Sequence, residues 1–303
     1  VRGMDLYILV DVCNYSLTYS MSGNTNHMSP DDHYQNLKRI IAAVGGKAKR
    51  INVIMPFLYE SRQHKRSSRE SLDCALALQE LTHMGVDNII TFDAHDPRVQ
   101  NAIPLSGFET VRPTYQFVKG LLDRYDDLII DSDHMMAISP DEGATERAVY
   151  LANVLNLDMG MFYKRRDYTR VVNGRNPIVA HEFLGSSVEG KDVIILDDMI
   201  SSGDSILDVA KQLKSRNAKR IFAAATFGLF TNGLDKFDEA YESGLIDGVL
   251  TTNLIYQTPE LLSRPYYINC DMSKYVALMI DTLNHDGSIS DILDPSERIQ
   301  VCV

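Results

Sequence analysis

Short apolar runs with the length of a β-strand alternate with amphipathic helical stretches along almost the whole chain. The strand-like runs lie at residues 5–10, 51–57, 88–96, 158–163, 192–197, 220–227 and 248–253, and a further run at 127–133 leads toward 137–143. Apolar side chains at helical spacing mark residues 30–44, 70–84, 144–155, 203–216, 234–242 and 272–283. This order predicts an α/β fold with mainly parallel sheets, flanked by helices and joined by right-handed crossovers. Two such sheets fit 303 residues, with a boundary near residue 115.

The stretch DVIILDDMISSGDS, residues 192–205, combines features that are usually found apart. An apolar run ends in two adjacent acids, a turn of small residues follows, and a helix with a clean apolar stripe begins. Ligands of open α/β sheets bind at the carboxyl ends of strands. Backbone N–H groups and hydroxyls at a helix start can cradle a phosphate. The residues predicted to form this cradle are Ser201, Ser202, Gly203, Asp204 and Ser205.

The two acids of this stretch suit a different group of the ligand from the phosphate. Ionised Asp197 and Asp198 can only accept hydrogen bonds, which suits the hydroxyls of a polyol or a metal ion rather than a phosphate. Together with the cradle, they predict a site for a sugar phosphate. A strand followed by an ordinary capped helix would use the same residue types. The five apolar residues before the acids and the helical stripe after them favour the functional interpretation.

The net charge and the spacing of the cysteines argue against several classes of function. A net charge of −11 argues against a broad nucleic-acid surface, because phosphate binding needs clustered Lys and Arg. No run of 18 apolar residues predicts a membrane span, and no secretory signal pattern opens the chain. The four cysteines lie far apart without a C-x-x-C motif, which argues against a zinc or redox site and indicates reduced thiols in the cytoplasm.

Six separated motifs resemble, in order, those of the ribose-phosphate pyrophosphokinases, also called phosphoribosyl pyrophosphate (PRPP) synthetases. They are SRQHKR (61–66), FDAHDPRVQ (92–100), ISPDEG (138–143), FYKRRD (162–167), DDMISSGDS (197–205) and TFGLFTNG (226–233). The resemblance implies two phosphoribosyltransferase-like domains, here 1–115 on the ATP side and 116–303 with the ribose 5-phosphate loop. It implies transfer of the pyrophosphoryl group of ATP to O1 of ribose 5-phosphate with Mg²⁺. It also implies a homodimer or a larger homo-oligomer.

The resemblance assigns the ATP contacts to Arg62 and Gln63. The planar fork of Arg suits a phosphate or stacks on a base, and Gln can hydrogen-bond a base edge. By residue type alone, a solvated basic loop is an equally good interpretation of residues 59–70. The family usually carries Asp after Arg-Gln, and His64 stands there instead.

The resemblance places Mg²⁺ against His95 and Asp141. Since Mg²⁺ prefers oxygen ligands and keeps several waters, we expect His95 to be a weak or outer ligand and Asp141 the stronger one. A structural His beside a strand, and an Asp that caps a helix start, are the simpler alternatives for these two residues.

The basic segment 163–175 shows no apolar periodicity and is predicted to be a charged, mobile loop. Phosphoryl transfer needs cations that neutralise the charge of the moving group. The resemblance assigns the catalytic Lys to Lys164 and a ribose-phosphate or transition-state Arg to Arg166. A loop that closes on ATP would also exclude water.

Four further features of the sequence bear on the function. The family's His after Thr in the last motif is Phe227 here, and residues 19–32 form a longer segment than usual. A PRPP-consuming phosphoribosyltransferase and a non-catalytic regulatory homologue are the two rival functions. Family members carry a segment before the point that matches VRGMDLYILV, so we expect a longer native chain, with the ribose-phosphate half of the site complete in 1–303 and the adenine half incomplete.

Overall fold

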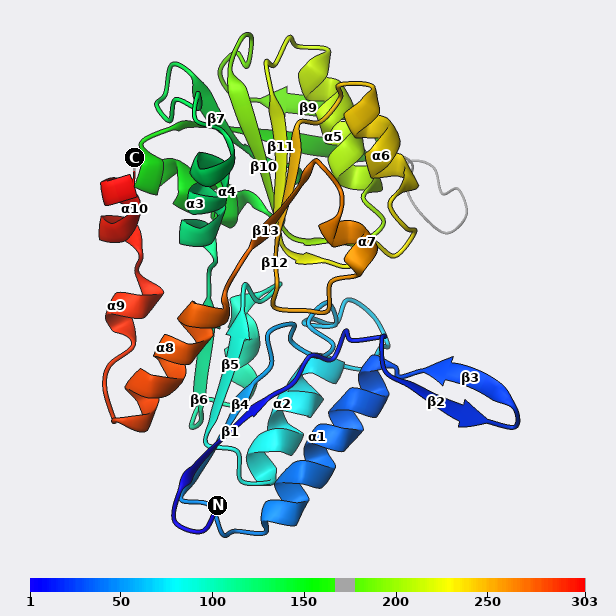
Figure 1. Ribbon diagram of the computed structural model, residues 1–303, viewed down its shortest axis with the longest axis vertical. Coiled ribbons are helices and arrows are strands. Elements are labelled where there is room, and N and C mark those ends of the chain that lie inside the picture. Colours follow the sequence, from blue (N-terminus) through cyan, green and yellow to red (C-terminus); the bar gives the residue numbers. More distant parts are fainter. Residues whose placement is uncertain (167–177, 303) are drawn as a thin grey trace. The chain divides into compact units, whose positions relative to one another are not determined.

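The computed structural model describes all residues except 167–177 and 303, and of residues 164–166 and 178–181 it describes the backbone alone. The chain divides into two compact units (Figure 1). The first comprises residues 1–113, 252–258 and 271–293, and the second comprises 114–251, 259–270 and 294–303. The division into functional domains at 1–115 and 116–303 stays a prediction, and two segments beyond residue 115 group with the first unit by contacts.

The first unit is built on a parallel sheet with helices packed on it. The strand order is β1 (Asp5–Leu9), β4 (Arg50–Ile54), β5 (Asn88–Phe92) and β6 (Gly107–Val111), all parallel. Helices α1 (Pro30–Val44) and α2 (Asp73–His83) bury their apolar faces against this sheet, and η1 (Pro97–Ala102), α8 (Ser273–Asn284) and α9 (Ser290–Leu293) complete the unit. The predicted α/β architecture with parallel strands is confirmed here.

Helix α1 begins and ends where its sequence signals predict. The Ser29 hydroxyl accepts from the Asp32 N–H at 3.2 Å, while the Asp32 carboxylate accepts from the Ser29 N–H at 2.8 Å. This reciprocal pair is a capping box, and Pro30 follows it at the first helical position. Gly45 ends the helix in the left-handed conformation, with φ of 54°.

The segment of unusual length forms a separate β-hairpin. Strands β2 (Thr18–Met21) and β3 (Asn24–His27) pair only with each other among the described strands, in antiparallel register. Ser22 and Gly23 form its turn with φ of 51° and 78°, the two positive values that a tight hairpin turn needs. Its residues are exposed or half-buried, so the hairpin adds nothing to the core.

The second unit contains a larger sheet. Its order is β13 (Tyr267–Cys270), β12 (Gly248–Thr252), β11 (Ile221–Gly228), β10 (Asp192–Ile200), β7 (Met135–Ser139), β8 (Asp158–Arg166) and β9 (Ile178–Leu184). The neighbours from β12 to β8 are parallel, and β9 runs antiparallel to β8. The helices of this unit are α3 (Thr114–Arg124), α4 (Thr145–Leu155), α5 (Asp204–Lys214), α6 (Asp235–Glu242), α7 (Pro259–Leu262) and α10 (Ser296–Cys302).

Strand β10 is buried on both faces, as the continuous apolar run predicts. Val193 and Ile195 pack in one cluster with apolar residues of α5 and α6. Ile194 and Leu196 pack in another cluster with residues of α3 and α4. This two-sided burial fixes β10 at the centre of the sheet and therefore fixes the position of the polar residues that follow it.

The apolar run at 127–133 is not itself a strand. Asp131 accepts hydrogen bonds from the N–H groups of Asp133 and His134, each at 2.9 Å, which bends the chain into a turn. The strand of this region, β7, begins directly after that turn, at Met135. A carboxylate that favours a turn thus overrides the local apolar pattern.

Candidate functional site

The predicted acids lie at the end of the central strand of the second unit. Strand β10 pairs in parallel with β7, with Ile195 opposite Ile138, so both strands end at the same edge of the sheet. Asp197 and Asp198 end the apolar part of β10, and Asp141 follows β7. Burial raises the pKa of Asp197 well above its usual range, and the nearby carboxylates of Asp198 and Asp141 raise it further. The site therefore concentrates acid charge, which a cation or hydroxyl donors would stabilise.

Asp198 is the more deeply enclosed of the adjacent acids, with 3% of its surface exposed. Its backbone N–H donates to Asp197 Oδ1 at 2.8 Å, which fixes the Asp197 carboxylate relative to the strand. A fixed acceptor at a strand end can orient a ligand hydroxyl without further rearrangement.

The turn after β10 leads directly into α5. Gly203 precedes the helix with φ of 83°, and a Cβ at this position would lie 2.4 Å from the buried ring of Phe237. Both the backbone angle and the close approach require glycine. Thr231 N–H donates to the Ser201 carbonyl at 3.0 Å, which ties the turn to the segment after β11.

The start of α5 has the features of an anion cradle. The N-cap of this helix is Gly203, which has no side chain to cap the first turn, and the Ser202 hydroxyl accepts from the Asp204 N–H at a long 3.4 Å. The N–H groups of that turn carry the positive end of the helix dipole, which attracts a phosphate. The predicted cradle residues Ser201 to Ser205 are thus brought together by the structure at one turn and helix start.

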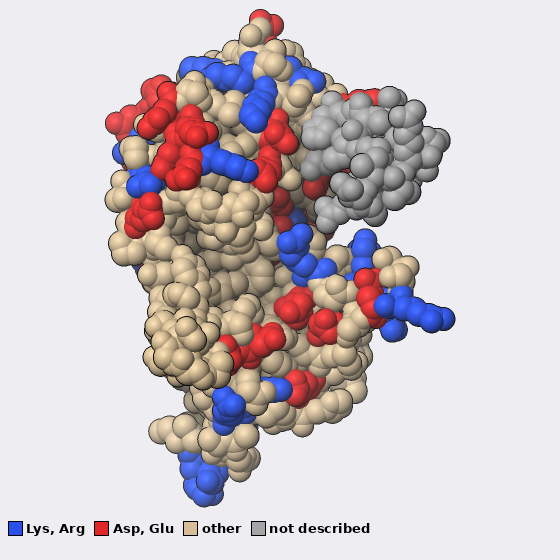
Figure 2. All heavy atoms as spheres, turned by 90° about the vertical axis from the view of Figure 1, so that its right-hand side faces the viewer, with Lys and Arg blue, Asp and Glu red and all other residues tan. Residues whose placement is uncertain are grey.

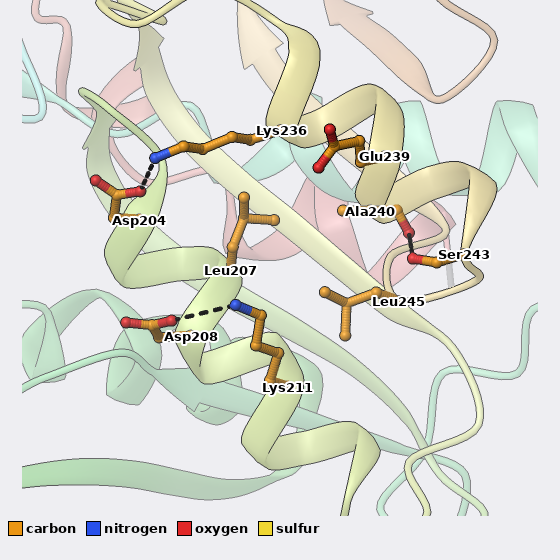
Figure 3. Close-up of a pocket in the computed structure, with 9 residues that line it drawn as sticks. All are labelled: Asp204, Leu207, Asp208, Lys211, Lys236, Glu239, Ala240, Ser243 and Leu245. Carbon is orange, nitrogen blue, oxygen red and sulfur yellow. Dashed lines mark hydrogen bonds and ion pairs between the residues drawn. The ribbon is translucent and has the colours of Figure 1, made fainter.

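The Asp204 side chain is engaged on the outer side of α5. Its Oδ1 lies 2.5 Å from Lys236 Nζ, and its Oδ2 accepts from the Ser202 hydroxyl at 3.0 Å. Figure 3 shows the Asp204–Lys236 pair at one end of a cavity of about 340 Å³ between α5 and α6. The apolar residues among those that line it are Leu207, Ala240 and Leu245. Sequence reasoning missed Lys236 altogether.

Asp141 organises the loop between β7 and α4. Its Oδ1 accepts from the N–H groups of Gly143 at 2.9 Å and Ala144 at 3.3 Å, which folds the loop ahead of α4. The N-cap of α4 is Ala144, without a side-chain cap hydrogen bond, so Asp141 shapes the loop and is not itself the cap of the helix. Among the described residues, no three His, Cys, Asp or Glu side chains are placed to hold a metal ion by themselves. The donor chemistry fits Mg²⁺ nevertheless, because this ion takes one or two carboxylates and completes its shell with water and substrate phosphates.

The first unit brings two of the predicted motifs together. The ring of His64, from the loop after β4, lies 5.2 Å from the ring of His95, from the loop after β5. His64 Nε2 also lies 3.5 Å from Asp96 Oδ2. His64 stands at the sequence position where the family usually carries an acid. In this chain it lies beside an acid of the second motif, Asp96.

The predicted ATP contacts lie in the same loop after β4. Arg62 is exposed, and Gln63 donates from Nε2 to the Ser71 carbonyl at 2.9 Å, which steadies the loop. The Arg62 guanidinium is thus accessible to an anion, while Gln63 has a structural contact in this state. Nothing in the structure tests their assignment to ATP, which stays a prediction.

The two predicted loop cations lie at the end of β8. Lys164 and Arg166 belong to this strand by their backbone, with Lys164 opposite His181 of β9. Their side chains, and most of the basic loop that follows, lie outside the described residues. Phe227, at the position of the family's His, is 3% exposed and lies opposite Met199 in the β10–β11 pair. It fills the core at that position.

Charges of both signs are spread over the surface. Figure 2 shows acidic and basic side chains intermixed over the described residues of the face drawn, without a continuous basic patch there. None of the described helices has the length and apolar character needed to cross a bilayer.

Comparison with known proteins identifies the family. Residues 1–85 match the N-terminal domain of ribose phosphate pyrophosphokinase, and residues 112–252 match the phosphoribosyl transferase domain. The ribose-phosphate pyrophosphokinase of Mycoplasma genitalium is 31% identical over 259 residues, which cover 85% of this chain and 70% of that protein. The one from Chromobacterium violaceum is 29% identical over 297 residues, covering 96% and 80%.

A solved structure extends the likeness to the fold. The crystal structure of phosphoribosylpyrophosphate synthetase from Mycobacterium smegmatis matches with a TM-score of 0.74 at 20% identity, over 95% of this chain and 100% of that one. Together, the motifs, the two matched domains and the sequence identity show that this chain belongs to the ribose-phosphate pyrophosphokinase family.

Proposed function

We propose that this chain is a Mg²⁺-dependent ribose-phosphate pyrophosphokinase that converts ATP and ribose 5-phosphate into PRPP and AMP. The observation that carries the proposal is the end of β10, where two adjacent acids, the first held by a backbone hydrogen bond, precede a turn and a helix start at Gly203. Hydroxyl acceptors beside an anion cradle match the two ends of a sugar phosphate. Membership of the family supplies the reaction.

The ribose 5-phosphate lies with its phosphate at residues 201–205 and its ring hydroxyls on Asp197 and Asp198. The N–H groups of the first turn of α5 donate to phosphate oxygens, and the two carboxylates accept from the hydroxyls. This places O1 of the sugar at a fixed distance from the acids. Such positioning turns a bimolecular step into an effectively unimolecular one.

In the reaction, O1 of ribose 5-phosphate forms a bond to the β-phosphorus of ATP, and the bond from that phosphorus to the α–β bridging oxygen breaks. AMP leaves with the bridging oxygen, and the O1 proton is released. Lys164 and Arg166 supply positive charge to the moving group, while Arg62 and Gln63 hold the nucleotide. Asp141 and His95 would hold Mg²⁺, which supplies charge neutralisation of the ATP phosphates when bound.

Two broader properties belong to the same proposal. We expect a homodimer or a larger homo-oligomer, as the family resemblance implies. The four free cysteines support a reducing, cytoplasmic location. Neither nucleic acid nor a membrane is a proposed partner.

Three parallel incubations test the proposal against its rivals. The chain with ATP, ribose 5-phosphate and Mg²⁺ should form AMP, and omission of the sugar phosphate or addition of a chelator should stop it. A chain that instead forms nucleotides from PRPP and a free base is a phosphoribosyltransferase. A chain that does neither, but alters the activity of a catalytic family member on mixing, is a regulatory homologue; either of these results would overturn the proposal.

A further inference from the structure

Asp204 presents an electrostatic conflict inside the proposed phosphate cradle. It is the first residue of α5, and its neighbours Ser201, Ser202, Gly203 and Ser205 are uncharged. A carboxylate at this position repels an incoming phosphate and competes with it for the positive end of the helix dipole. A cradle that binds ribose 5-phosphate has to keep this negative charge away from the ligand or cancel it.

The structure holds both oxygens of this carboxylate in place. Lys236 Nζ, from α6, contacts Oδ1 at 2.5 Å, and the Ser202 hydroxyl donates to Oδ2 at 3.0 Å (Figure 3). The hydrogen bond from Lys236 lowers the pKa of Asp204, with a further contribution from Ser202. The carboxylate therefore stays ionised at neutral pH, and its charge is met by the ammonium of Lys236.

The position of Lys236 is unfavourable for its own helix. It lies in the first turn of α6, where the helix dipole favours acids and where Asp235 and Asp238 are found. The pair it forms is also exposed, with 52% of the Lys236 side chain and 56% of the Asp204 side chain accessible. Exposed ion pairs add little to stability. Stabilisation of the fold is thus a weak reason for this pairing.

We propose that Lys236 is a positioning residue for ribose 5-phosphate, which holds the Asp204 carboxylate toward α6 and cancels its charge so that the cradle accepts a phosphate. This inference rests on the proposed function and deepens it. Lys236 acts through Asp204 and does not touch the substrate. An uncharged residue at position 204 would leave the cradle without negative charge. With Asp204 there, the ammonium of Lys236 is needed to reach the same state.

The same helix offers a matched control. Lys211 Nζ lies 3.6 Å from Asp208 Oδ1, one turn further along α5, and both side chains are exposed, at 65% and 58%. Lys211 lines the same cavity between α5 and α6 as Lys236 (Figure 3). Removal of either lysine costs one exposed ion pair and one positive charge. Lys236 contacts an acid of the cradle directly, whereas Lys211 acts on Asp204 only as the smallest, longer-range contribution.

The test compares Lys236→Met, Lys211→Met, Lys236→Arg and the double variant Lys236→Met with Asp204→Asn. Lys236→Met should raise KM for ribose 5-phosphate about tenfold, the effect of about 1.4 kcal/mol of uncompensated charge, while KM for ATP and kcat change less than about twofold. Lys211→Met should leave all three close to wild type. Lys236→Arg and the double variant should restore KM for ribose 5-phosphate, because the first keeps the charge and the second removes the need for it.

Calorimetry with ribose 5-phosphate, on the same variants, separates failure of this inference from failure of the proposed function. If the wild type binds ribose 5-phosphate but forms no AMP, the reaction is wrong and the role of Lys236 is still decided by the affinities. Equal effects of Lys236→Met and Lys211→Met, or no recovery in the double variant, would overturn the inference. A wild type that does not bind ribose 5-phosphate would overturn both. Thermal melts of each variant show whether a loss of affinity follows a loss of folding.

Discussion

Gly203 shows how one residue sets the geometry of the cradle. Replacement by Ala adds a Cβ 2.4 Å from the Phe237 ring, on a backbone with φ of 83°. We expect Gly203→Ala to lower the free energy of unfolding by about 2–4 kcal/mol, from left-handed strain plus displacement of a buried ring. Gly190→Ala is the matched control, because φ is 74° there and nothing lies within 4 Å of the added atom. Urea unfolding should give a loss of about 1–2 kcal/mol for it; equal losses for both would mean that the ring moves aside at no cost.

A second prediction at the scale of single residues concerns Lys164. Its backbone lies in β8, next to β7 and therefore near the edge of the sheet at which Asp141 lies. If its ammonium neutralises charge that develops during pyrophosphoryl transfer, Lys164→Ala should lower kcat by about 10²–10³ with little change in KM. Steady-state kinetics with both substrates check this. A rise in KM at unchanged kcat would mean that Lys164 binds ground state and transition state equally.

Site residues that are neighbours in the sequence could be predicted from it, whereas those brought together by the fold could not. The motif at 192–205 carries strand, acids, turn and helix start in one stretch, so its position at the sheet edge followed from the pattern. Lys236 could not be found in this way. It lies 32 positions after Asp204, and a Lys near a helix start has no distinguishing spacing. The proximity of His64 to His95 likewise depends on two loops that only the sheet brings together.

At the scale of elements, the β2–β3 hairpin is an addition that the unit can lose. In β2, Tyr19 and Met21 alternate with Thr18 and Ser20, but the run is only four residues long and its partner β3, Asn-Thr-Asn-His, has no apolar residue, so no strand was predicted there. The Met28 N–H donates to the Leu17 carbonyl at 2.9 Å, so the chain already closes at the base of the hairpin. His27 of β3 contacts the preceding segment, with Nδ1 2.6 Å from the Tyr15 carbonyl oxygen, whereas the apolar cluster that holds α1 against the sheet includes no residue of 18–27.

Replacement of Thr18–His27 by two glycines tests this independence. We expect the free energy of unfolding to change by less than about 1 kcal/mol, because only exposed or half-buried residues are lost and the loop closes over a short span. AMP formation should be unchanged. Leu37→Ala in α1, at 1% exposure, shows the sensitivity of the assay and should cost about 2–5 kcal/mol. A comparable loss on hairpin removal would contradict the interpretation.

At the scale of the whole molecule, the alternation of strands and helices determines the α/β architecture. Contacts between residues far apart in the sequence determine which segments belong to which compact unit. The two-sided burial of β10 followed from its continuous apolar run. The grouping of 252–258 and 271–293 with the first unit did not, since it depends on contacts such as Asp11 Oδ2 with the Tyr256 N–H at 2.7 Å. A local sequence pattern cannot predict a contact between two residues that are 245 positions apart.

The cysteines give a prediction about the whole fold. Burial raises the pKa of Cys74 and of Cys270 to about 12 and also raises that of Cys13, whereas Cys302 is exposed. At pH 8, a thiol reagent should therefore modify one cysteine rapidly in the folded chain and four after unfolding in urea. Cys302→Ser should remove the rapid phase. Rapid modification of Cys74 or Cys270 in that variant would show that a buried region opens in the folded state.

The same thiols predict how stability depends on alkaline pH. Their pKa values in the folded chain lie above the unfolded value of 9.0, so the folded state holds these protons more firmly. Their contribution to stability is complete below about pH 9 and is lost as the pH rises toward 12. The urea midpoint should consequently fall over this range, and by less in Cys74→Ala measured against its own value at pH 8.

The most direct test of the central claim follows the phosphorus atoms of ATP. The chain is incubated with ribose 5-phosphate, Mg²⁺ and ATP labelled at either the α- or the γ-phosphorus, and the products are separated. Pyrophosphoryl transfer predicts the α label in AMP and the γ label in PRPP, in equal amounts and only when ribose 5-phosphate and Mg²⁺ are both present. An α label in ADP, a γ label in free phosphate, or product formation without ribose 5-phosphate would contradict the assignment of this chain as a ribose-phosphate pyrophosphokinase.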